Sequence, residues 1–582
     1  MVIMMIEEQE VKIKAIDEGF TNVKVLLLRP PQTFYYGDWP KGPRLSLPLG
    51  LLSIASFLRI KGIPNVTIYD SFVEGDAIDK YLIQRNKNKK IANIWTDFDE
   101  SQRPEGENKE VKFGASFSEI ENYLRIQKPN IVGITNSFRE NEQETIRSIE
   151  IIRRVLPDTV IVVGGANANA EPDKFLMNSN SPDYVALGDG EKPLLGIINI
   201  FLGNVDRHDV PGLVFLENGK VSRSAQQEAV YDLDEYGKHD YSLLKMERYF
   251  RYEENGVMAR SKFQYNGSDR VVSLVTTRGC PYKCTFCSIH IHAGRKLRRY
   301  SEKYIVDEIE DLVNNFNVKH IHFEDDNLTL DKTRFIKVFN SIRDKGIRFT
   351  WDTPNGIFAN TLDDQMAETM LSSGVTYLIF GVESGDQRVL DEVVKKQPLT
   401  VEKVVNAFKI AKKHKIDSHA FYIIGFPEEK LYEIRRTLYF AAKHLLIHGI
   451  IPHLAIARAD PGTELYNEAI AKDVLVTDHV SSNIMGVHAD MFARHRIKTD
   501  EFSPEKLESY SVLFHRVAIV IIMLRVIVRM IWSPIIYARA IKTHFNKNPE
   551  FKISNLKLWV ISLFFAQFFY LNSIERYYRN KD

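Results

Sequence analysis

The stretch TTRGCPYKCTFCSIH, residues 276–290, decides the fold, because it carries all three cysteines of the chain directly after an apolar segment. Cys280, Cys284 and Cys287 have the spacing Cys-x3-Cys-x2-Cys. Three thiolates from one loop can hold three irons of a four-iron cubane and leave the fourth iron open. An open metal position is typical of a catalytic site, whereas structural sites are usually closed.

A zinc site of three cysteines completed by His290 or His292 is the alternative for this loop. The spacing is unusual for a zinc finger and the loop follows a predicted strand, so we favour the cluster. Three cysteines cannot build a disulfide framework, and their clustering indicates a metal site in a reducing compartment.

Outward from this loop, short apolar runs alternate with segments of helical spacing six times, and only the last helix is less clear. The runs are Val271–Thr276, His320–Asp325, Arg348–Asp352, Thr376–Gly381, His419–Gly425 and His453–Arg458. Six parallel βα units predict a (β/α)6 partial barrel over residues 268–490, with its active site at the C-terminal ends of the strands.

The cysteine loop resembles the hallmark Cys-x3-Cys-x-aromatic-Cys of the radical S-adenosylmethionine (radical SAM) superfamily, with Phe286 as the aromatic residue. Further motifs follow the predicted strands in the order that the family shows, namely HFEDDNLT (His322–Thr329), GVESGD (Gly381–Asp386), YIIGFPEE (Tyr422–Glu429) and ADPGTELY (Ala459–Tyr466). Each motif alone could be an ordinary loop, so their order carries the resemblance.

The resemblance implies a [4Fe–4S] cluster on the three cysteines and S-adenosylmethionine (SAM) as its ligand. It implies that an electron donor such as ferredoxin or flavodoxin reduces the cluster, which cleaves SAM to a 5′-deoxyadenosyl radical. The barrel would keep water from this radical. The cofactor contacts implied in this part of the chain are Phe286, Glu324, Asp325, Glu383, Ser384, Ile424 and Gly425.

Before the barrel, strand-like and helix-like segments alternate from Val23 onward and predict a doubly wound, Rossmann-like α/β domain over residues 20–205. Residues 84–112 are mostly polar and charged, which indicates an insertion or a mobile loop. Residues 206–267 are interpreted as a linker with a hairpin at Gly212–Ser224 that turns at Asn218-Gly219.

This N-terminal domain resembles the cobalamin-binding domain that precedes the barrel in a large radical SAM subfamily. The matching segments are Leu47–Gly62, Ile134–Phe138, Val163–Asp173 and Asp183–Glu191. Glycines at strand ends let the backbone approach a large flat ligand. The cobalamin contacts implied here are Thr135, Ser137, Gly164, Gly165, Gly188 and Gly190. The alternative is a Rossmann-like domain that binds nothing.

The Asp-x-His-x-x-Gly motif that supplies a lower cobalt ligand in other cobalamin proteins is missing, and no histidine precedes His208. We therefore expect any bound cobalamin to be base-off, with a non-histidine side chain or nothing below the cobalt.

A basic run, Arg295, Lys296, Arg298 and Arg299, follows the cysteine loop. Such a run is usually a solvated face before a helix, and Ser301 with Glu302 predicts a helix start. The functional alternative is contact with an anionic substrate or with the SAM carboxylate, for which Arg299 is the first candidate.

The composition is that of an ordinary globular chain, with 582 residues, 77 Lys+Arg, 76 Asp+Glu and a net charge of +1. The near-zero net charge argues against a nucleic-acid-binding protein. The first 20 residues lack the pattern of a signal peptide, so we expect a cytoplasmic protein.

The C-terminal extension, residues 491–582, differs from the rest, because from Ser511 onward it has 11 Lys+Arg and 3 Asp+Glu. Its two apolar stretches are Val517–Trp532, which arginines interrupt, and Leu558–Ile574, which is only about 17 residues long. Neither fits a transmembrane helix, which needs about 20 apolar residues. We favour a helical cap on the barrel. The alternative is a surface that contacts an anionic membrane peripherally or admits a hydrophobic substrate.

The sequence thus predicts a cobalamin-dependent radical SAM enzyme, most simply a methyltransferase that C-methylates an unactivated carbon. The first rival is a radical cyclase or C–C coupling enzyme of the same subfamily acting on an isoprenoid, lipid or tetrapyrrole-like substrate. Methylthiolation is disfavoured, because no cysteines remain for a second cluster. A cobalamin or iron–sulfur sensor is the alternative that is not an enzyme.

Overall fold

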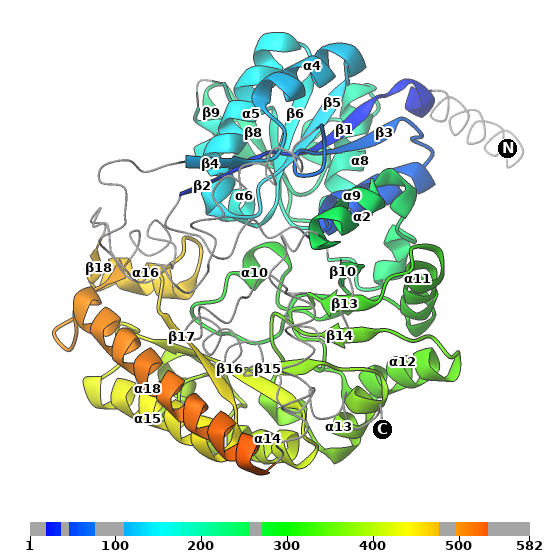
Figure 1. Ribbon diagram of the computed structural model, residues 1–582. Helices are drawn as coiled ribbons and strands as arrows, with labels where there is room; N and C mark the ends of the chain where they lie inside the picture. The colour runs from blue at the N-terminus through cyan, green and yellow to red at the C-terminus, as the bar shows by residue number, and fades with distance from the viewer. Residues whose placement is uncertain are drawn as a thin grey trace, which may run out of the picture.

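The computed structural model describes residues 19–35, 46–75, 110–178, 180–227, 229–254, 270–476 and 496–532. Most of the predicted insertion at 84–112 and the second apolar stretch at Leu558–Ile574 lie outside the described residues. Two α/β bodies lie one above the other, with the N-terminal domain over one end of the barrel (Figure 1).

The N-terminal domain is built on a seven-stranded sheet of order β3-β1-β5-β6-β7-β8-β9. Its first five strands are parallel: β1 (Val25–Arg29), β3 (Val66–Asp70), β5 (Ile131–Thr135), β6 (Val160–Gly164) and β7 (Tyr184–Ala186). Alternate side chains of β1 point to opposite faces, so Leu27 joins one core cluster and Leu26 joins another. Helices α2 (Leu49–Ile60) and α8 (Glu191–Phe201) cover the first face, and α4 (Phe117–Gln127) and α5 (Glu142–Val155) cover the second. This is the doubly wound domain that the sequence predicted.

The hairpin predicted within the linker is instead part of this sheet. Strand β8 (Leu213–Glu217) pairs antiparallel with β7, and β9 (Lys220–Arg223) pairs with β8 as the edge strand. The turn is at Asn218 and Gly219 as predicted, and both have the positive φ angles, 51° and 74°, of a tight hairpin turn. The hairpin joins the sheet because β7 would otherwise leave its backbone groups unpaired.

The second domain has six parallel strands, as predicted, in two groups of three. The first group is β10 (Val271–Leu274), β13 (His320–Phe323) and β14 (Thr350–Asp352), and the second is β15 (Tyr377–Glu383), β16 (Asp417–Ile424) and β17 (Ile451–Ile456). Isolated bridges from Trp351 to Val375 and from Ile357 to Phe380 connect the two groups. The arrangement is therefore a curved, partial barrel.

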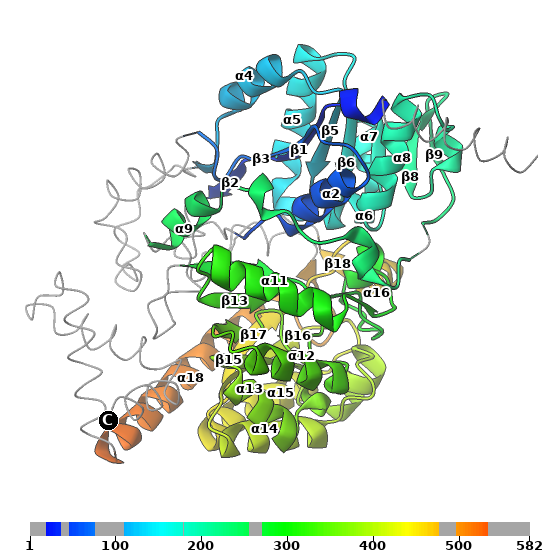
Figure 2. The same cartoon turned by 90° about the vertical axis from the view of Figure 1, so that its right-hand side faces the viewer.

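Helices follow the strands and cover the outer face of the barrel (Figure 2). They are α11 (Glu302–Asn315), α12 (Lys332–Asp344), α13 (Asp364–Ser372), α14 (Val401–Lys413) and α15 (Leu431–His448). Helix α16 (Glu464–Ala471), after β17, begins beside the cysteine loop, where the Leu465 N–H donates to the Thr285 carbonyl at 2.9 Å. Ser301 caps α11 by accepting from the Tyr304 N–H, which confirms the predicted helix start. The remaining short elements are β2 (Gln32–Tyr35), β4 (Glu110–Phe113), α6 (Ala166–Ala170), α7 (Pro172–Leu176), α9 (Met246–Glu254), β11 (Thr277–Arg278), α10 (Ile289–His292), β12 (Arg298–Arg299), β18 (Leu475–Val476) and β19 (Arg496–Ile497).

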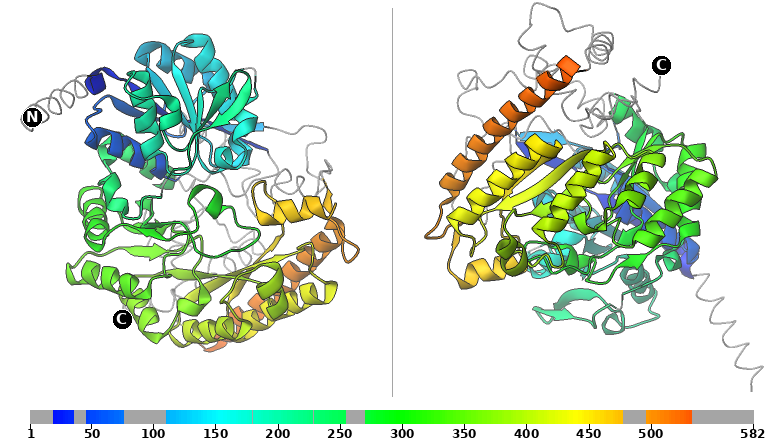
Figure 3. Two further views of the ribbon diagram at one scale, coloured as in Figure 1. Left: turned by 180° about the vertical axis from the view of Figure 1, so that it is seen from behind. Right: turned by 90° about the horizontal axis from the view of Figure 1, so that it is seen from below.

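The described part of the C-terminal extension is mainly one long helix, α18 (Pro504–Trp532), which lies along α15 on the outside of the barrel (Figures 1 and 3). Ala518, Ile522 and Val526 bury one face of α18 against Leu445 and Ile451. By length and composition, Pro504–Val528 is apolar enough to cross a membrane, and 22% of its most apolar window is buried. The sequence predicted that the stretch Val517–Trp532 alone is unfit for a span, whereas the helix that contains it begins earlier and meets that test by length and composition. One face of the helix packs on the barrel, as expected, and another apolar face is exposed.

Candidate active site at the cysteine loop

The cysteine loop leaves the barrel at the C-terminal end of β10 and returns through a two-stranded ribbon. Strand β11 pairs antiparallel with β12, so the loop between them is closed at its base. Gly279 has a φ of 87°, and a Cβ on it would lie 2.5 Å from the Lys296 carbonyl oxygen, so only glycine fits this closure. The Cys280 N–H donates to the Gly294 carbonyl at 3.3 Å, and the Cys287 N–H donates to the Cys284 carbonyl at 3.1 Å.

The three cysteines are partly buried within this loop. Burial raises the pKa of Cys284 to about 12 and that of Cys287 to about 11, and it also raises the pKa of Cys280. A thiol with such a pKa is a poor free nucleophile and becomes a thiolate only when a metal binds it. Without a metal, the three groups are therefore protonated, weakly reactive thiols.

The three cysteines do not form a compact group suited to a single metal ion, and a cluster does not require such a group. Among the described residues, the one group of three metal-type donors whose atoms all lie within 4.8 Å of one another is His320, His322 and Asp352. The cysteines form no such group with each other or with His290 and His292. Ligands of a cubane bind different irons, so they stand farther apart than ligands that share one tetrahedral zinc.

A buried ion pair that the sequence did not reveal lies beside the cysteines. The Lys396 ammonium is 2.5 Å from a Glu383 carboxylate oxygen, and both side chains are less than 10% exposed. Burial lowers the pKa of Lys396, but the Glu383 carboxylate and the Cys284 thiolate raise it above its ordinary value. The lysine therefore places a fixed positive charge near the thiolates. No periodicity marks it, since it follows an irregular π-helical turn, Val389–Val393.

Glu383 and Ser384, the predicted contacts at the end of the fourth strand, have different surroundings. Glu383 ends β15 with a φ of 69°, a conformation that is uncommon outside glycine and concentrates at functional sites. Ser384 is fully buried, and its hydroxyl is 2.9 Å from the Thr437 hydroxyl, so it ties the strand end to α15.

Near the end of β16, Phe286, Ile424 and Phe426 share one core cluster. The Gly425 N–H donates to Glu429 at 2.6 Å. The aromatic residue of the cysteine loop thus packs on the glycine turn of the fifth strand.

The residues after the second strand have unequal roles. Asp325 is 1% exposed, and its carboxylate accepts from the hydroxyls of Thr276 and Thr277 at 2.7 Å each. It therefore anchors the start of the cysteine loop and has little capacity left for a ligand. Glu324 is partly buried and accepts from Ser273 at 3.3 Å. Asp326, which the sequence did not single out, accepts from the Gly279 N–H at 2.9 Å.

The predicted cobalamin contacts lie on the C-terminal ends of the N-terminal strands. A Cβ on Gly164 would meet only the Ala186 carbonyl, at 3.8 Å, which leaves room beside the strand end. Gly165, in contrast, has a φ of 104°, and a Cβ there would lie 2.7 Å from the Asn136 carbonyl. Packing within the protein therefore already requires Gly165. The Thr135 and Ser137 hydroxyls lie 3.4 Å apart at the end of β5.

Two further glycines, which flank the start of α8, have different surroundings. The Gly188 N–H donates to the Asn169 side chain at 2.7 Å. A Cβ on Gly190 would lie 2.5 Å from the Ile54 side chain, so Gly190 faces helix α2. The room at Gly164, with the two hydroxyls nearby, fits the approach of a large ligand, while Gly165 and Gly190 serve the fold.

The cysteine loop and this edge of the N-terminal domain face each other. Helix α10, which follows Cys287, packs against α6, which follows Gly165. The basic run is held by ion pairs and hydrogen bonds, and Arg299, which is about half exposed, pairs with Asp331 at 2.6 Å. This favours the solvated-face interpretation for Arg299.

Comparisons with known proteins agree with this geometry. Residues 274–441 match the family model of the radical SAM superfamily. The chain is 29% identical over 419 residues, 69% of this chain and 73% of the relative, to the cytidylyl-2-hydroxyethylphosphonate methyltransferase of Streptomyces wedmorensis. It is 26% identical over 326 residues, 55% of this chain and 56% of the relative, to the anaerobic magnesium-protoporphyrin IX monomethyl ester cyclase of Rubrivivax gelatinosus.

Its fold is similar to that of the cobalamin-dependent SAM radical enzyme OxsB, solved with aqua-cobalamin and SAM bound. The TM-score is 0.61 at 14% identity, and the match covers 96% of this chain and 81% of OxsB.

Proposed function

We propose that this chain, a radical SAM enzyme with the fold of cobalamin-dependent members of that superfamily, transfers a methyl group to an unactivated carbon of a small-molecule substrate. The radical SAM domain implies a [4Fe–4S] cluster, SAM and a reductant. The observation that carries the proposal is that the cysteine loop faces the strand ends of the N-terminal domain, so two cofactors could act on one substrate between them. The similarity to a methyltransferase over 69% of this chain supports it.

In this proposal Cys280, Cys284 and Cys287 hold the cluster. When bound, the cluster and SAM would supply a 5′-deoxyadenosyl radical, and cobalamin would supply the methyl group. Glu383 and Lys396 would hold charges of both signs beside the cysteines, where SAM must be oriented. A group held in fixed geometry can contribute several orders of magnitude in rate by orientation alone.

The packing of Phe286 on the turn at Ile424 and Gly425 supports a role for these three residues in shaping the adenine end of the SAM site. Glu324 is the remaining candidate near the methionine end of SAM. Ser384 would act through the strand end that it fixes and not by contact.

For cobalamin, the room at Gly164 and the hydroxyls of Thr135 and Ser137 support binding at the strand ends, with Gly188 beside them. His208, the first histidine of the chain, lies 3.1 Å from Glu217 on the far hairpin. The lower face of the cobalt would therefore meet no histidine of this domain. An EPR spectrum of the cob(II)alamin form that shows nitrogen coupling from an imidazole of this domain would contradict this.

The test is anaerobic reconstitution with iron, sulfide and cobalamin, followed by reduction in the presence of SAM and a substrate extract. We expect both 5′-deoxyadenosine and S-adenosylhomocysteine to form. The Cys287→Ala variant, which loses one cluster ligand, is the control and should form no 5′-deoxyadenosine. S-adenosylhomocysteine without cobalamin in the mixture would contradict methyl transfer through the corrin.

A radical cyclase or C–C coupling enzyme is the second candidate, and the similarity to a magnesium-protoporphyrin ester cyclase over 55% of this chain favours it. It predicts 5′-deoxyadenosine without S-adenosylhomocysteine in the same experiment. If neither product forms while the cluster is intact, the chain acts instead as a sensor.

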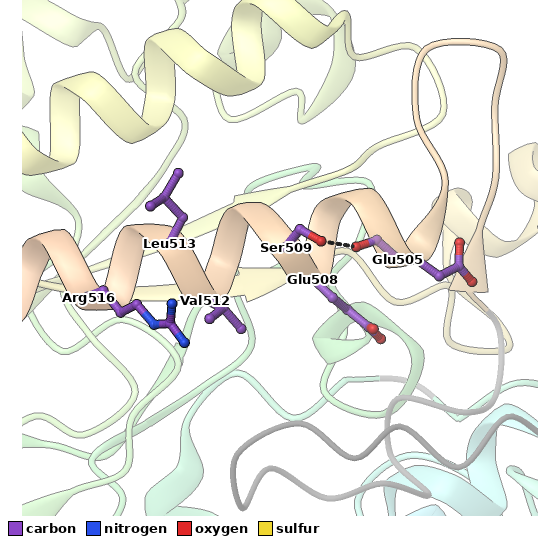
Figure 4. A pocket seen from close by; sticks show the side chains of 6 residues that line it. All are labelled: Glu505, Glu508, Ser509, Val512, Leu513 and Arg516. Atoms are coloured by element: carbon purple, nitrogen blue, oxygen red, sulfur yellow. Dashed lines mark hydrogen bonds between the residues drawn. The ribbon is translucent and has the colours of Figure 1, made fainter.

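We further propose that the enzyme works in the cytoplasm, takes electrons from a ferredoxin or flavodoxin, and touches an anionic membrane through α18. Ile519, Met523 and Val528 of α18 are exposed, and six further exposed apolar side chains recur at intervals of three and four residues, which makes one stripe along the helix. The six are Leu513, Val517, Val520, Leu524, Ile527 and Ile531. Figure 4 shows Leu513 projecting from one side of the helix while Val512 and Arg516 project from the other.

The charge of this region supports a lipid partner over a second copy of the chain. From Ser511 onward the sequence has 11 basic and 3 acidic residues, so two copies would repel each other, whereas anionic lipid would attract each copy. An apolar helix face beside basic residues is the usual composition of an interfacial helix.

Vesicle sedimentation tests this contact with phosphatidylcholine vesicles that contain or lack phosphatidylglycerol. We expect salt-sensitive binding to the anionic vesicles, and loss of binding in the double variant L524S/I527S. The control is I126S/M177S, which changes two apolar residues of the N-terminal domain that are even more exposed. Equal binding of both variants, or a dimer in light scattering that only L524S/I527S abolishes, would overturn the proposal.

A further inference from the structure

Two arginines of the cysteine-loop ribbon reach across the domain boundary to two carboxylates of the N-terminal domain. Arg278 lies on β11, two residues before Cys280, and its guanidinium is 2.8 Å from Glu191 and 3.2 Å from Asp189. Arg298, its partner on β12, also pairs with Asp189, with a second contact at 3.1 Å. We call Arg278, Arg298, Asp189 and Glu191 the arginine clasp.

The two carboxylates are fixed by their own domain. Ser53 of α2 donates to Glu191 at 2.5 Å and accepts from Arg278 at 3.0 Å. The Tyr236 hydroxyl donates to Asp189 at 2.9 Å. Because Glu191 is the first residue of α8, the clasp binds the ribbon to the start of that helix. Movement of the ribbon is thus resisted by α2 and α8 together.

The clasp is buried, and its charges balance. The side chains of Arg298, Asp189 and Glu191 are at most 9% exposed, and that of Arg278 is 18% exposed. Two guanidinium groups face two carboxylates, so losing any one charge leaves another buried without compensation. Arginine suits this place because its planar fork can bind two acceptors at once, which lysine cannot do.

The carboxylates alternate in sequence with two predicted cobalamin contacts, Gly188 and Gly190. On the other side of the loop, α10 packs against α6, which directly follows Gly165. The cysteine loop is therefore attached, before its first cysteine and after its last, to the two glycine loops of the N-terminal domain.

We propose that the arginine clasp is a positioning device that couples the cysteine loop to the cofactor edge of the N-terminal domain. A ligand that binds at one of these sites then changes the stability or the ligand affinity of the other. This inference rests on the proposed function, which puts cobalamin at that edge. Two cofactors that act on one carbon must keep a fixed separation, and an error of about 1 Å can cost a hundredfold in rate. Coupling between two sites is reciprocal, so a change on either side of the boundary must act on the other side.

Two variants of the full-length, cluster-loaded protein test this from opposite sides. E191Q removes one charge in the N-terminal domain, and we expect amide hydrogen exchange of residues 277–299 to rise about five- to a hundredfold. R278K keeps the charge in the barrel domain but loses the fork, and we expect cobalamin to bind more weakly by a similar factor in a spectrophotometric titration. The double variant should be no worse than the more affected single variant, because both break the same link.

The matched control is R153K, which changes an arginine that pairs with Asp183 at 2.7 Å entirely within the N-terminal domain. It should change neither cysteine-loop exchange nor cobalamin affinity. If E191Q does not fold, Ser53→Ala replaces it in the hydrogen-exchange experiment, because it keeps all four charges and removes only the Ser53 hydrogen bonds to Glu191 and Arg278.

The outcomes separate this inference from the proposed function. If E191Q affects exchange only within its own domain, or if the two variants act additively, the clasp is an ordinary stabilising contact and the inference is wrong. If the wild-type protein binds no cobalamin, the proposed function fails, and the exchange arm still decides whether the clasp couples the domains.

Discussion

The buried pair of Lys396 and Glu383 gives the sharpest prediction for stability. Replacing Lys396 with methionine removes the ammonium and keeps most of the side-chain volume. The Glu383 carboxylate lies 2.5 Å from the Lys396 ammonium in the wild type and is 6% exposed. In the variant this buried carboxylate has no ammonium partner. Breaking a buried ion pair in this way typically costs about 3–5 kcal/mol, and solvent screens little of the charge at this depth.

We therefore expect K396M to lower the free energy of unfolding by about 3 kcal/mol or more. The double variant E383Q/K396M should recover much of this loss, because no buried charge remains. Urea unfolding of the full chain, anaerobic and without cluster, measures both. The reasoning is refuted if K396M costs less than about 1 kcal/mol, or if the two substitutions add, since residues in contact should couple.

Three further predictions concern single residues. Cys287→Ala should lower bound iron and sulfide and abolish reductive SAM cleavage, as iron analysis and chromatography of 5′-deoxyadenosine would show; a zinc-loaded wild type with no iron would contradict it. Burial raises the pKa of Glu429 to about 8, so the folded state holds a proton that the unfolded state loses near pH 4.5. Stability should then fall as the pH rises from about 5 to 8, and thermal unfolding of E429Q should show a weaker fall. Asp325→Asn should cost about 1–3 kcal/mol in urea unfolding, because the amide cannot accept all the bonds from the threonines, while Asp344→Asn, at an exposed site, should cost little.

The sequence was informative about this molecule where its signals are local. The six strands of the barrel and the start of α11 at Ser301 follow from apolar periodicity and capping, which a few neighbouring residues determine. The turn at Asn218 and Gly219 was also readable, but its membership of the N-terminal sheet was not. That membership depends on the unpaired edge of β7, which lies about 30 residues earlier.

The site was less readable, because side-chain direction and distant partners are not local properties. Glu324, Asp325 and Asp326 are consecutive, and at a strand end neighbouring side chains point to different sides, so one motif contains three roles. Lys396 contacts Glu383 only because the chain turns back after β15, and no residue spacing in the sequence predicts that turn. The arginine clasp likewise joins residues about 90 positions apart, from Asp189 to Arg278.

The hairpin that closes the N-terminal sheet has a consequence for how copies of this protein behave in a crowded solution. The edge of a sheet offers unpaired backbone groups to which another chain can add, the first step toward aggregation. Here the edge strand β9 has only four residues, and its two ends are the exposed cations Lys220 and Arg223, the second of which pairs with Asp173. An identical strand that approached in either direction would meet like charges, so the hairpin makes this edge a poor template for fibre growth.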